Sequence, residues 1–257
     1  MLRAEAAPTR QIAHPDARER GIKHLVLPLY DNVPTRRFPF VTVALIVANA
    51  LVWILYQVPG LEASVVDLGF YPCEAEGSCD GVGYPWPLNA FTSMFAHGSW
   101  MHVIGNMLFL WIFGNNVEDA LGRIRFLLFY LGAGIAALAL QNAVTLGLGS
   151  AEDATIPQVG ASGAIAGVLG AYLLLHPLAR VTTLVFVLLI DVPAMLFLVG
   201  WFGFQLWLGG FSLVEPESGG GVAFFAHIGG FVFGLLFGRA LVSRPPPPRA
   251  AYSARSR

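Results

Sequence analysis

Long apolar segments alternate with short polar ones along most of the chain. The apolar segments lie near residues 38–58, 101–117, 124–146, 160–176, 186–210 and 222–242. Each has roughly the 17–25 residues that an α-helix needs to cross a bilayer. The fifth contains Asp191 and Pro193, so we expect residues 181–190 to form a lead-in near the interface and the helix to begin close to Pro193. The pattern predicts an all-α fold, a polytopic membrane protein built as a bundle of six transmembrane helices.

Composition agrees with a protein that lies in lipid. Hydrophobic residues make up 56% of the chain and charged residues only 12%, whereas charged residues make up about 25% of an average soluble domain. The formal net charge of −1 gives no indication of nucleic-acid binding. We therefore expect the lipid bilayer, and not nucleic acid, as a partner.

The positions of the charges predict the orientation. All 15 Lys and Arg residues lie before the first span, between spans two and three, before span five, or from Arg239 onward at the end of span six. The alternate loops carry only acidic residues, namely Glu62, Asp67, Glu74, Glu76, Asp80, Glu152, Asp153, Glu215 and Glu217. By the positive-inside rule both termini are expected to be cytoplasmic, in the inner or plasma membrane of a cell, which requires an even number of spans.

Three regions follow from this layout. Residues 1–36 lack the apolar core of a signal peptide and are expected to form a cytoplasmic arm. Residues 37–243 form the predicted six-helix domain, in which the long aromatic loop 59–100 is expected to pack at the membrane surface. Residues 244–257, rich in Pro and Arg, are expected to be a mobile cytoplasmic tail.

The two cysteines, Cys73 and Cys79, lie in a polar, glycine-rich part of the long loop. Their number and spacing match no zinc-site pattern, so we expect no metal. A disulfide and two unpaired thiols both remain open for this pair.

A few polar residues lie at the outer ends of the predicted spans. They are His97, His102 and Asn106 around span two, Ser162 on span four and His227 on span six. Spans two, four and six all begin on the outer side in the predicted topology, so these residues are expected at one depth. Taken alone, either Ser162 or His227 would be interpreted as a side chain that hydrogen-bonds two helices together. All five polar residues at one depth favour a catalytic site.

Small residues follow both candidate catalytic residues at helical spacing. Gly230, Gly234 and Gly238 lie on the helical face of His227, and Ala166 and Gly170 lie on that of Ser162. Such faces let two helix backbones approach closely, so the side chains of Ser162 and His227 are predicted to reach hydrogen-bond distance.

A serine hydroxyl needs a neighbouring base in order to attack an amide carbon, and His227 is the candidate base. The oxyanion that then forms needs hydrogen-bond donors. The backbone N–H of Ser162, the Asn106 amide and the His102 ring are the candidates, and His102 and Asn106 share one helical face.

Three segments resemble, in order, the signature segments of rhomboid proteases of the bacterial type. They are His97-Gly-Ser-Trp-Met-His102-Val-Ile-Gly-Asn106, Gly160-Ala-Ser162-Gly163 and Ala226-His227-Ile-Gly-Gly230, and the resemblance runs from about Phe38 to Arg239. It implies an intramembrane serine endopeptidase that uses no cofactor and cleaves transmembrane proteins.

The resemblance also implies roles for individual residues. Ser162 is the implied nucleophile and His227 the implied general base of a Ser–His dyad, while His102 and Asn106 line the oxyanion site. Supporting positions are His97, Gly160, Gly163, Gly230 and Gly234. Loop 59–100 is implied to lie partly in the membrane, beside a gate made by span five.

The sequence departs from the family pattern at two places. Several rhomboids carry an aromatic residue four positions after the nucleophile, where it stacks on the base, but this chain has Ala166 there. This leaves open how His227 is held. The Trp-Arg pair that many members carry in the first loop is absent from 59–100.

Two other classes of membrane protein are alternatives to a protease. An inactive rhomboid-like protein that binds transmembrane helices is the main alternative, and a small transporter would be expected to show internal repeats or midplane charges. Asn106 as a structural hydrogen-bonding residue also stays open, and His97 is expected to fix the first loop to span two. No chemistry is expected of the surface histidines His14, His24 and His176, the interfacial Asp191, or the solvated group Glu118, Asp119, Arg123 and Arg125.

Overall fold

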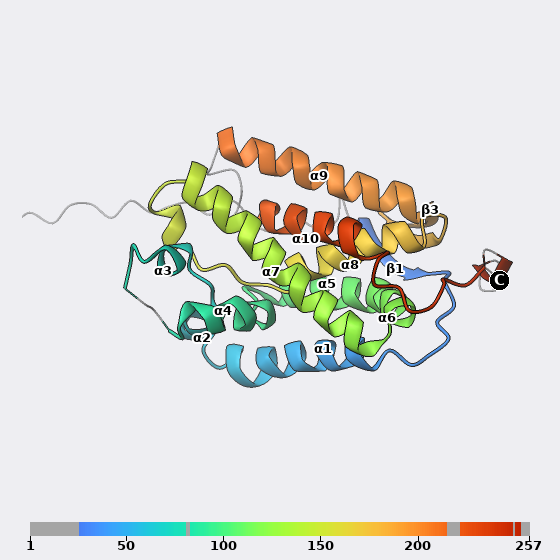
Figure 1. Cartoon of the computed structure of the whole chain (residues 1–257), viewed down its shortest axis with the longest axis horizontal. Coiled ribbons are helices and arrows are strands. Elements are labelled where there is room, and N and C mark those ends of the chain that lie inside the picture. The colour runs from blue at the N-terminus through green and yellow to red at the C-terminus, as the bar shows by residue number, and fades with distance from the viewer. Residues whose placement is uncertain (1–25, 81–82, 215–221, 249, 253–257) are drawn as a thin grey trace, which may run out of the picture.

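The computed structural model describes residues 26–80, 83–214, 222–248 and 250–252, most of them helical (Figure 1). The helices are α1 (Phe40–Leu51), α2 (Leu61–Leu68), α3 (Pro72–Glu76), α4 (Trp86–Thr92), α5 (Trp100–Phe109), α6 (Asn115–Leu121), α7 (Arg123–Leu148), α8 (Ser162–Leu175), α9 (Ala194–Val214) and α10 (Phe224–Phe237). The short turns are η1 (Val52–Gln57) and η3 (Leu110–Gly114), which are π-helical, and η2 (Ser93–Phe95) and η4 (Asp153–Thr155), which are 3₁₀. His14, His24 and the remainder of residues 1–25 lie outside the described part.

Three helices are long and apolar enough to cross a membrane. They are Phe40–Gln57, which joins α1 to η1, α7, and α9 over Ala194–Leu213. The apolar helices α8 and α10 have 14 residues each and fall below that length. The chain is a membrane protein, while the count of six spans stays a prediction.

A small sheet corrects the prediction of an all-α fold. β1 (Val26–Asp31), β2 (Arg180–Val185) and β3 (Leu188–Pro193) form an antiparallel sheet in the order β1-β2-β3. The lead-in predicted at 181–190 is therefore a β-hairpin, whose tight turn holds Phe186 at a φ of 57°. Its β-branched residues favour strands over helix. The helix that follows begins at Ala194, next to the Pro193 start that was predicted.

Asp31 links the sheet to the helices. Its carboxylate accepts hydrogen bonds from the Asn116 amide at 2.6 Å and from the Tyr172 hydroxyl at 2.5 Å. These donors come from α6 and α8, so β1, which belongs to the predicted arm, is part of the folded domain.

Helix α8 lies at the centre of the bundle and is buried along nearly all its length. In Figure 1, α7, α9 and α10 lie around it. Phe113 packs edge-on against Tyr172 at 4.9 Å between ring centroids, and both rings are buried. A helix surrounded by other helices needs apolar or small residues on every side, and α8 has them.

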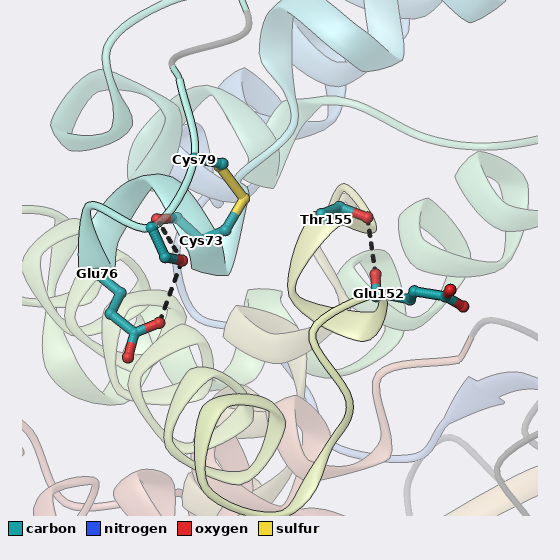
Figure 2. Close-up of a disulfide and its surroundings, with 6 residues drawn as sticks. Cys73, Glu76, Cys79, Glu152 and Thr155 are labelled. Carbon is teal, nitrogen blue, oxygen red and sulfur yellow. Dashed lines mark hydrogen bonds between the residues drawn. A yellow bond between two sulfur atoms is a disulfide. The ribbon is translucent and has the colours of Figure 1, made fainter.

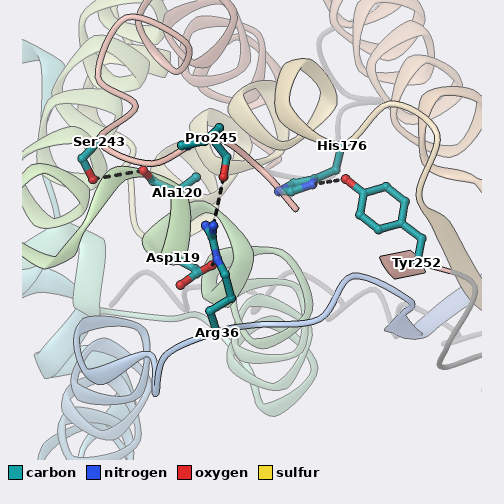
Figure 3. Close-up of polar contacts among 7 residues, drawn as sticks. All are labelled: Arg36, Asp119, Ala120, His176, Ser243, Pro245 and Tyr252. Carbon is teal, nitrogen blue, oxygen red and sulfur yellow. Dashed lines mark hydrogen bonds and ion pairs between the residues drawn. The ribbon is translucent and has the colours of Figure 1, made fainter. Parts of the chain in front are cut away.

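Hydrogen bonds and an ion pair connect several segments at the end of the bundle around Arg36 (Figure 3). Glu118 is buried, and its carboxylate accepts hydrogen bonds from the backbone N–H of Val41 and Thr42 at the start of α1. Asp119 is also buried and pairs with Arg36 at 2.8 Å. The prediction of a solvated connection at Glu118 and Asp119 is therefore wrong, because these carboxylates cap and pair other groups.

Part of the tail packs against the same end. The buried ring of His176 is 2.9 Å from the Tyr252 hydroxyl, and Arg36 donates to the carbonyl of Pro245 (Figure 3). His176 was predicted to lie on the surface, and that prediction is wrong. Tyr252, expected to be mobile with the tail, is buried at 9% exposure.

Asp191, expected at the interface, lies in the β-hairpin. Its carboxylate accepts a hydrogen bond from the Thr182 hydroxyl of the neighbouring strand.

The long loop folds into short helices at the opposite end. Cys73 and Cys79 form a disulfide beside η4, where the Thr155 hydroxyl donates to the backbone carbonyl of Glu152 (Figure 2). Of the two states left open for the cysteines, the structure has the bonded one. The disulfide closes a turn of the loop at the end of α3.

Candidate active site

Ser162 and His227 face each other from two helices. Ser162 is the first residue of α8, and His227 lies in the first turn of α10. The His227 Nε2 atom is 2.8 Å from the Ser162 hydroxyl oxygen, and both residues are half-buried. This is the distance at which an imidazole can take the proton of a hydroxyl group.

Glycines bring the two helices into backbone contact. A β-carbon at Gly230 would collide with the carbonyl oxygen of Gly163, and one at Gly234 would collide with that of Gly167. Gly163 and Gly167 also lie against alanine side chains of α7. The predicted stripe is therefore a real contact between α8 and α10, and it is this contact that allows the Ser162 and His227 side chains to meet.

A side chain of α9 contacts the Nδ1 atom of His227. Its Nδ1 atom is 2.8 Å from the Oε1 atom of Gln205, whose side chain is buried. An amide oxygen accepts only, so this bond places the proton on Nδ1 and leaves the Nε2 lone pair directed at Ser162. Trp201 lies one turn earlier on α9, with its ring 5.8 Å from that of His227. Gln205 and Trp201 therefore position the His227 imidazole in this chain, which has Ala166 where several rhomboids have an aromatic residue.

The first turn of α10 is also fixed from α7. The backbone N–H of Ala226, the residue before His227, donates to the Gln141 side-chain oxygen at 3.2 Å. The same N–H also donates to the carbonyl of Ala223 at 3.1 Å. Gln141 therefore adds a second acceptor, which ties the first turn of α10 to α7.

Gly160 lies between His102 and Ser162. Its φ is 128°, which side-chain-bearing residues rarely adopt. A β-carbon there would come within 2.8 Å of the His102 Nε2 atom and 3.5 Å of the Ser162 hydroxyl oxygen. The His102 ring therefore lies against the turn that presents Ser162. The Gly98 N–H is 3.4 Å from His102 Nδ1, an arrangement in which Nε2 carries the proton.

Asn106 lies one turn after His102 on α5. Its side chain is buried, and its Nδ2 atom has no hydrogen-bond partner among the residues that the structure describes. A buried amide donor without a partner costs free energy. A group that acquires negative charge during a reaction would supply that partner.

His97 supports the site from outside the helices. Its backbone N–H and carbonyl pair with both ends of the Gln57 side chain at 2.8 Å and 2.9 Å, and its ring lies edge-on to His102. Burial, and to a smaller extent the electrostatic effect of the neighbouring His102, lowers the pKa of His97 to about 3. His97 was expected to fix the loop to span two; it contacts His102 on α5 and is held at the end of span one.

A small cavity of about 30 Å³ lies behind Ser162. Ser93, Gln158 and Gly160 are among the residues that line it. The Ser93 hydroxyl and the Gln158 side-chain oxygen are buried without a partner in the described part of the chain. This is enough space for a water molecule, which needs roughly 10–15 Å³ of cavity volume.

Sequence reasoning identified the residues that face one another but missed those that hold them. Gln57, Gln141, Trp201 and Gln205 were not named. The one available signal was that three glutamines lie within apolar segments, where polar side chains are costly and usually have a purpose.

Known proteins resemble this chain over the same region. A family model described as "Rhomboid domain" matches residues 85–244, more than half of the chain. The mouse "Presenilin-associated rhomboid-like protein, mitochondrial" is 29% identical over 199 residues, which are 75% of this chain and 46% of that protein. "Rhomboid protein 1, mitochondrial" of Saccharomyces cerevisiae is 33% identical over 57% of this chain and 39% of its own length. The chain thus spans about half the length of the mouse relative, and less of the yeast one.

Proposed function

Since the chain belongs to the rhomboid family, we propose that it is an intramembrane serine endopeptidase that hydrolyses peptide bonds in or near transmembrane segments. The observation that carries the proposal is the 2.8 Å contact between His227 Nε2 and the Ser162 hydroxyl. No carboxylate is needed in this arrangement, because the Gln205 amide oxygen orients the imidazole.

The proposed reaction begins when Ser162 attacks the carbonyl carbon of the scissile bond. His227 Nε2 takes the hydroxyl proton as the new C–O bond forms, and the carbonyl oxygen becomes an oxyanion. The backbone N–H of Ser162, the Asn106 amide and the His102 Nε2–H are the proposed donors to that oxygen. His227 then passes its proton to the leaving amine, which breaks the peptide C–N bond.

Water completes the cycle. His227 takes a proton from a water molecule as the water oxygen attacks the acyl carbon, and the Ser162 oxygen leaves with that proton. The cavity beside Ser162, lined by Ser93 and Gln158, is a suitable route for this water because its polar atoms are free to bind it.

The proposed substrates are transmembrane proteins. A helix keeps its own amides hydrogen-bonded, so the scissile segment must unwind before Ser162 reaches it. Small or helix-breaking residues near its outer end lower that cost. A substrate whose span is all Leu should therefore be cleaved more slowly than one with Gly or Ala near the site, and equal rates would contradict this preference.

The proposed orientation follows from the arginines. The end of the bundle with Arg36, Arg123 and Arg180 faces the cytoplasm under the positive-inside rule, and the dyad opens toward the other side. The inner or plasma membrane of a cell stays a prediction, since the mouse and yeast relatives are mitochondrial by name.

Proteolysis by the purified protein tests the proposal. The full chain is reconstituted with a single-span substrate bearing Gly and Ala near its outer end, and product is followed with time. Wild type should form two fragments, and Ser162→Ala and His227→Ala should form none above background. Ser150→Ala, an exposed serine of the α7–α8 connection, is the control and should retain activity.

The inactive binder makes the opposite prediction. If wild type binds the substrate but produces no fragments, or if Ser162→Ala cleaves as well as wild type, the endopeptidase proposal fails.

A further inference from the structure

A basic pocket lies at the end of the bundle opposite the disulfide. It has a volume of about 410 Å³ and is lined by the first turn of α7, the residues before α1 and those after α10. Four arginines line it, namely Arg37, Arg123, Arg125 and Arg244. The catalytic proposal uses none of them.

The carboxylates that share the pocket are already engaged. Asp119 pairs with Arg36 at 2.8 Å through one oxygen, its other oxygen having no hydrogen-bond partner in the described part of the chain, and Glu118 accepts the N–H groups at the start of α1. Among the described residues, none of the four lining arginines has a carboxylate within ion-pair distance. The pocket therefore has an excess of positive charge that its own acidic groups do not neutralise.

Two of these arginines make side-chain contacts within the protein, and a third is fixed through its backbone. The Arg123 guanidinium lies 4.2 Å from the ring centroid of Phe40, and Arg125 donates to the carbonyl of Leu241 at 3.4 Å. The backbone N–H of Arg244 donates to the carbonyl of Ala120 at 3.1 Å. These contacts leave guanidinium N–H groups available, and guanidinium groups bind phosphate oxygens well.

Exposed apolar side chains border the same pocket. Phe38 is 57% exposed and Ile124 77%, and both line it; Leu128, one helical turn further along α7, is 65% exposed. Because α7 is long and apolar enough to cross the membrane, this surface lies where the helix meets lipid. A ligand there would have its charge in the pocket and an apolar part along α1 and α7.

We propose that this pocket binds the phosphate headgroup of an anionic phospholipid, with the acyl chains against the exposed side chains of α7. Basic pockets between transmembrane helices, on the side where Lys and Arg gather, bind anionic lipid headgroups in other membrane proteins. A free phosphate ion would use the guanidinium groups but not the apolar border, which is why we assign a lipid.

Lipid binding by the full-length protein tests the proposal without any measurement of proteolysis. Wild type in detergent is titrated with phosphatidylglycerol, phosphatidylcholine or inorganic phosphate, and bound ligand is measured by native mass spectrometry. Wild type should retain phosphatidylglycerol in preference to phosphatidylcholine. Each arginine removed should weaken phosphatidylglycerol binding about fivefold.

Matched variants separate the pocket from general surface charge. Arg37→Gln and Arg37→Gln/Arg125→Gln remove charges in the pocket, whereas Arg180→Gln removes an exposed one on β2. Arg37 is exposed, so the single variant is expected to fold, and a melting curve checks this. Loss in the pocket variants with retention in Arg180→Gln supports the site.

Three results would overturn it. They are equal retention of phosphatidylglycerol by wild type and the double variant, equal loss in Arg180→Gln, and inorganic phosphate displacing the lipid at similar concentration. The last result would reassign the pocket to a free anion. Because the readout is bound lipid, each result is independent of whether the protein cleaves a substrate.

Discussion

A neutral amide orients the proposed catalytic base. Gln205 Oε1 is 2.8 Å from His227 Nδ1 and comes from α9, a different helix from those that carry Ser162 and His227. An acceptor at this place selects the imidazole tautomer that can accept the Ser162 proton. Gln205 is thus a positioning residue whose effect should appear in turnover rather than in substrate binding.

Replacing Gln205 by Met removes the acceptor and keeps the length of the side chain. We expect kcat to fall about tenfold, since one orienting hydrogen bond contributes roughly 1–1.5 kcal/mol, while KM stays unchanged. Gln205→Glu restores an acceptor and should recover kcat while raising the apparent pKa of the base in the pH–rate profile. An unchanged kcat in Gln205→Met, with cleavage of the same substrate as the assay, would contradict the positioning role.

The buried ring of His97 should make stability depend on pH. Its pKa is lowered to about 3 in the folded protein, against about 6.5 when unfolded. The unfolded chain therefore binds the proton more readily between these values, and the free energy of unfolding should fall as pH decreases below about 6.5.

The slope due to His97 is about 1.4 kcal/mol per pH unit. Unfolding of wild type and His97→Gln is followed by denaturant titration at pH 7 and pH 5, and the difference between the two proteins isolates this residue. Wild type should lose about 2 kcal/mol more than the variant. Equal losses would show that His97 stays neutral in both states or is protonated in both.

The residues proposed to react could be predicted from the sequence, whereas the residue that orients the base could not. Ser162, His227, His102 and Asn106 are polar groups at the ends of apolar segments, and such groups stand out. Gln205 lies within an apolar segment, 22 residues before His227. No helical spacing connects two residues on different helices, so only the packing of α9 on α10 could reveal their contact.

At the scale of elements, the glycine face between α8 and α10 sets the distance between Ser162 and His227. Gly230→Ala places a methyl group against the carbonyl oxygen of Gly163. We expect a loss of about 1–3 kcal/mol in the free energy of unfolding, as for other overpacked sites. Activity should fall up to about a hundredfold because the reacting groups separate.

The matched control is Gly147→Ala on α7. A β-carbon at Gly147 would have no atom within 4 Å, so this change should leave activity unaltered and stability equal or slightly higher. Both variants are compared by thermal melting and by substrate cleavage. If Gly230→Ala behaves like Gly147→Ala, the close contact of α8 and α10 is not what holds the site together.

The helices were predictable and the sheet was not. The apolar runs gave the positions of α1, α7 and α9 within a few residues because their length and hydropathy decide them. The run 181–190 was ambiguous, since a continuous apolar stretch of that length fits a strand as well as a helix. The hairpin is also paired along β2 with β1, whose residues Val26–Asp31 lie more than 140 residues earlier in the chain.

At the scale of the whole molecule, the two polar ends lie on opposite sides of the bundle. Helix α3, which carries Cys73 of the disulfide, lies at one end, and strands β1 and β3 lie at the other (Figure 1). The placement of basic residues indicated this division, but not that the tail returns to pack on His176. Contacts such as that of Tyr252 with His176, 76 residues apart, follow from the fold rather than from local pattern.

Single cysteines test the orientation. Cys73 and Cys79 are bonded, so Glu152→Cys and Arg180→Cys each add one exposed thiol, at opposite ends. In sealed vesicles whose outer membrane face is exposed, a membrane-impermeant maleimide should label Glu152→Cys directly. It should label Arg180→Cys only after the membrane is opened. Labelling of both from the same side would contradict the arrangement in which α8 carries the chain from one face to the other.

The most direct test of the central claim is covalent capture of the proposed nucleophile. The full-length protein in membranes is treated with a fluorophosphonate probe, and the modified peptide is identified by mass spectrometry. The account predicts one adduct on Ser162, absent from Ser162→Ala and strongly reduced in His227→Ala. Folded wild-type protein that takes up no probe, or an adduct of equal yield in Ser162→Ala, would contradict it.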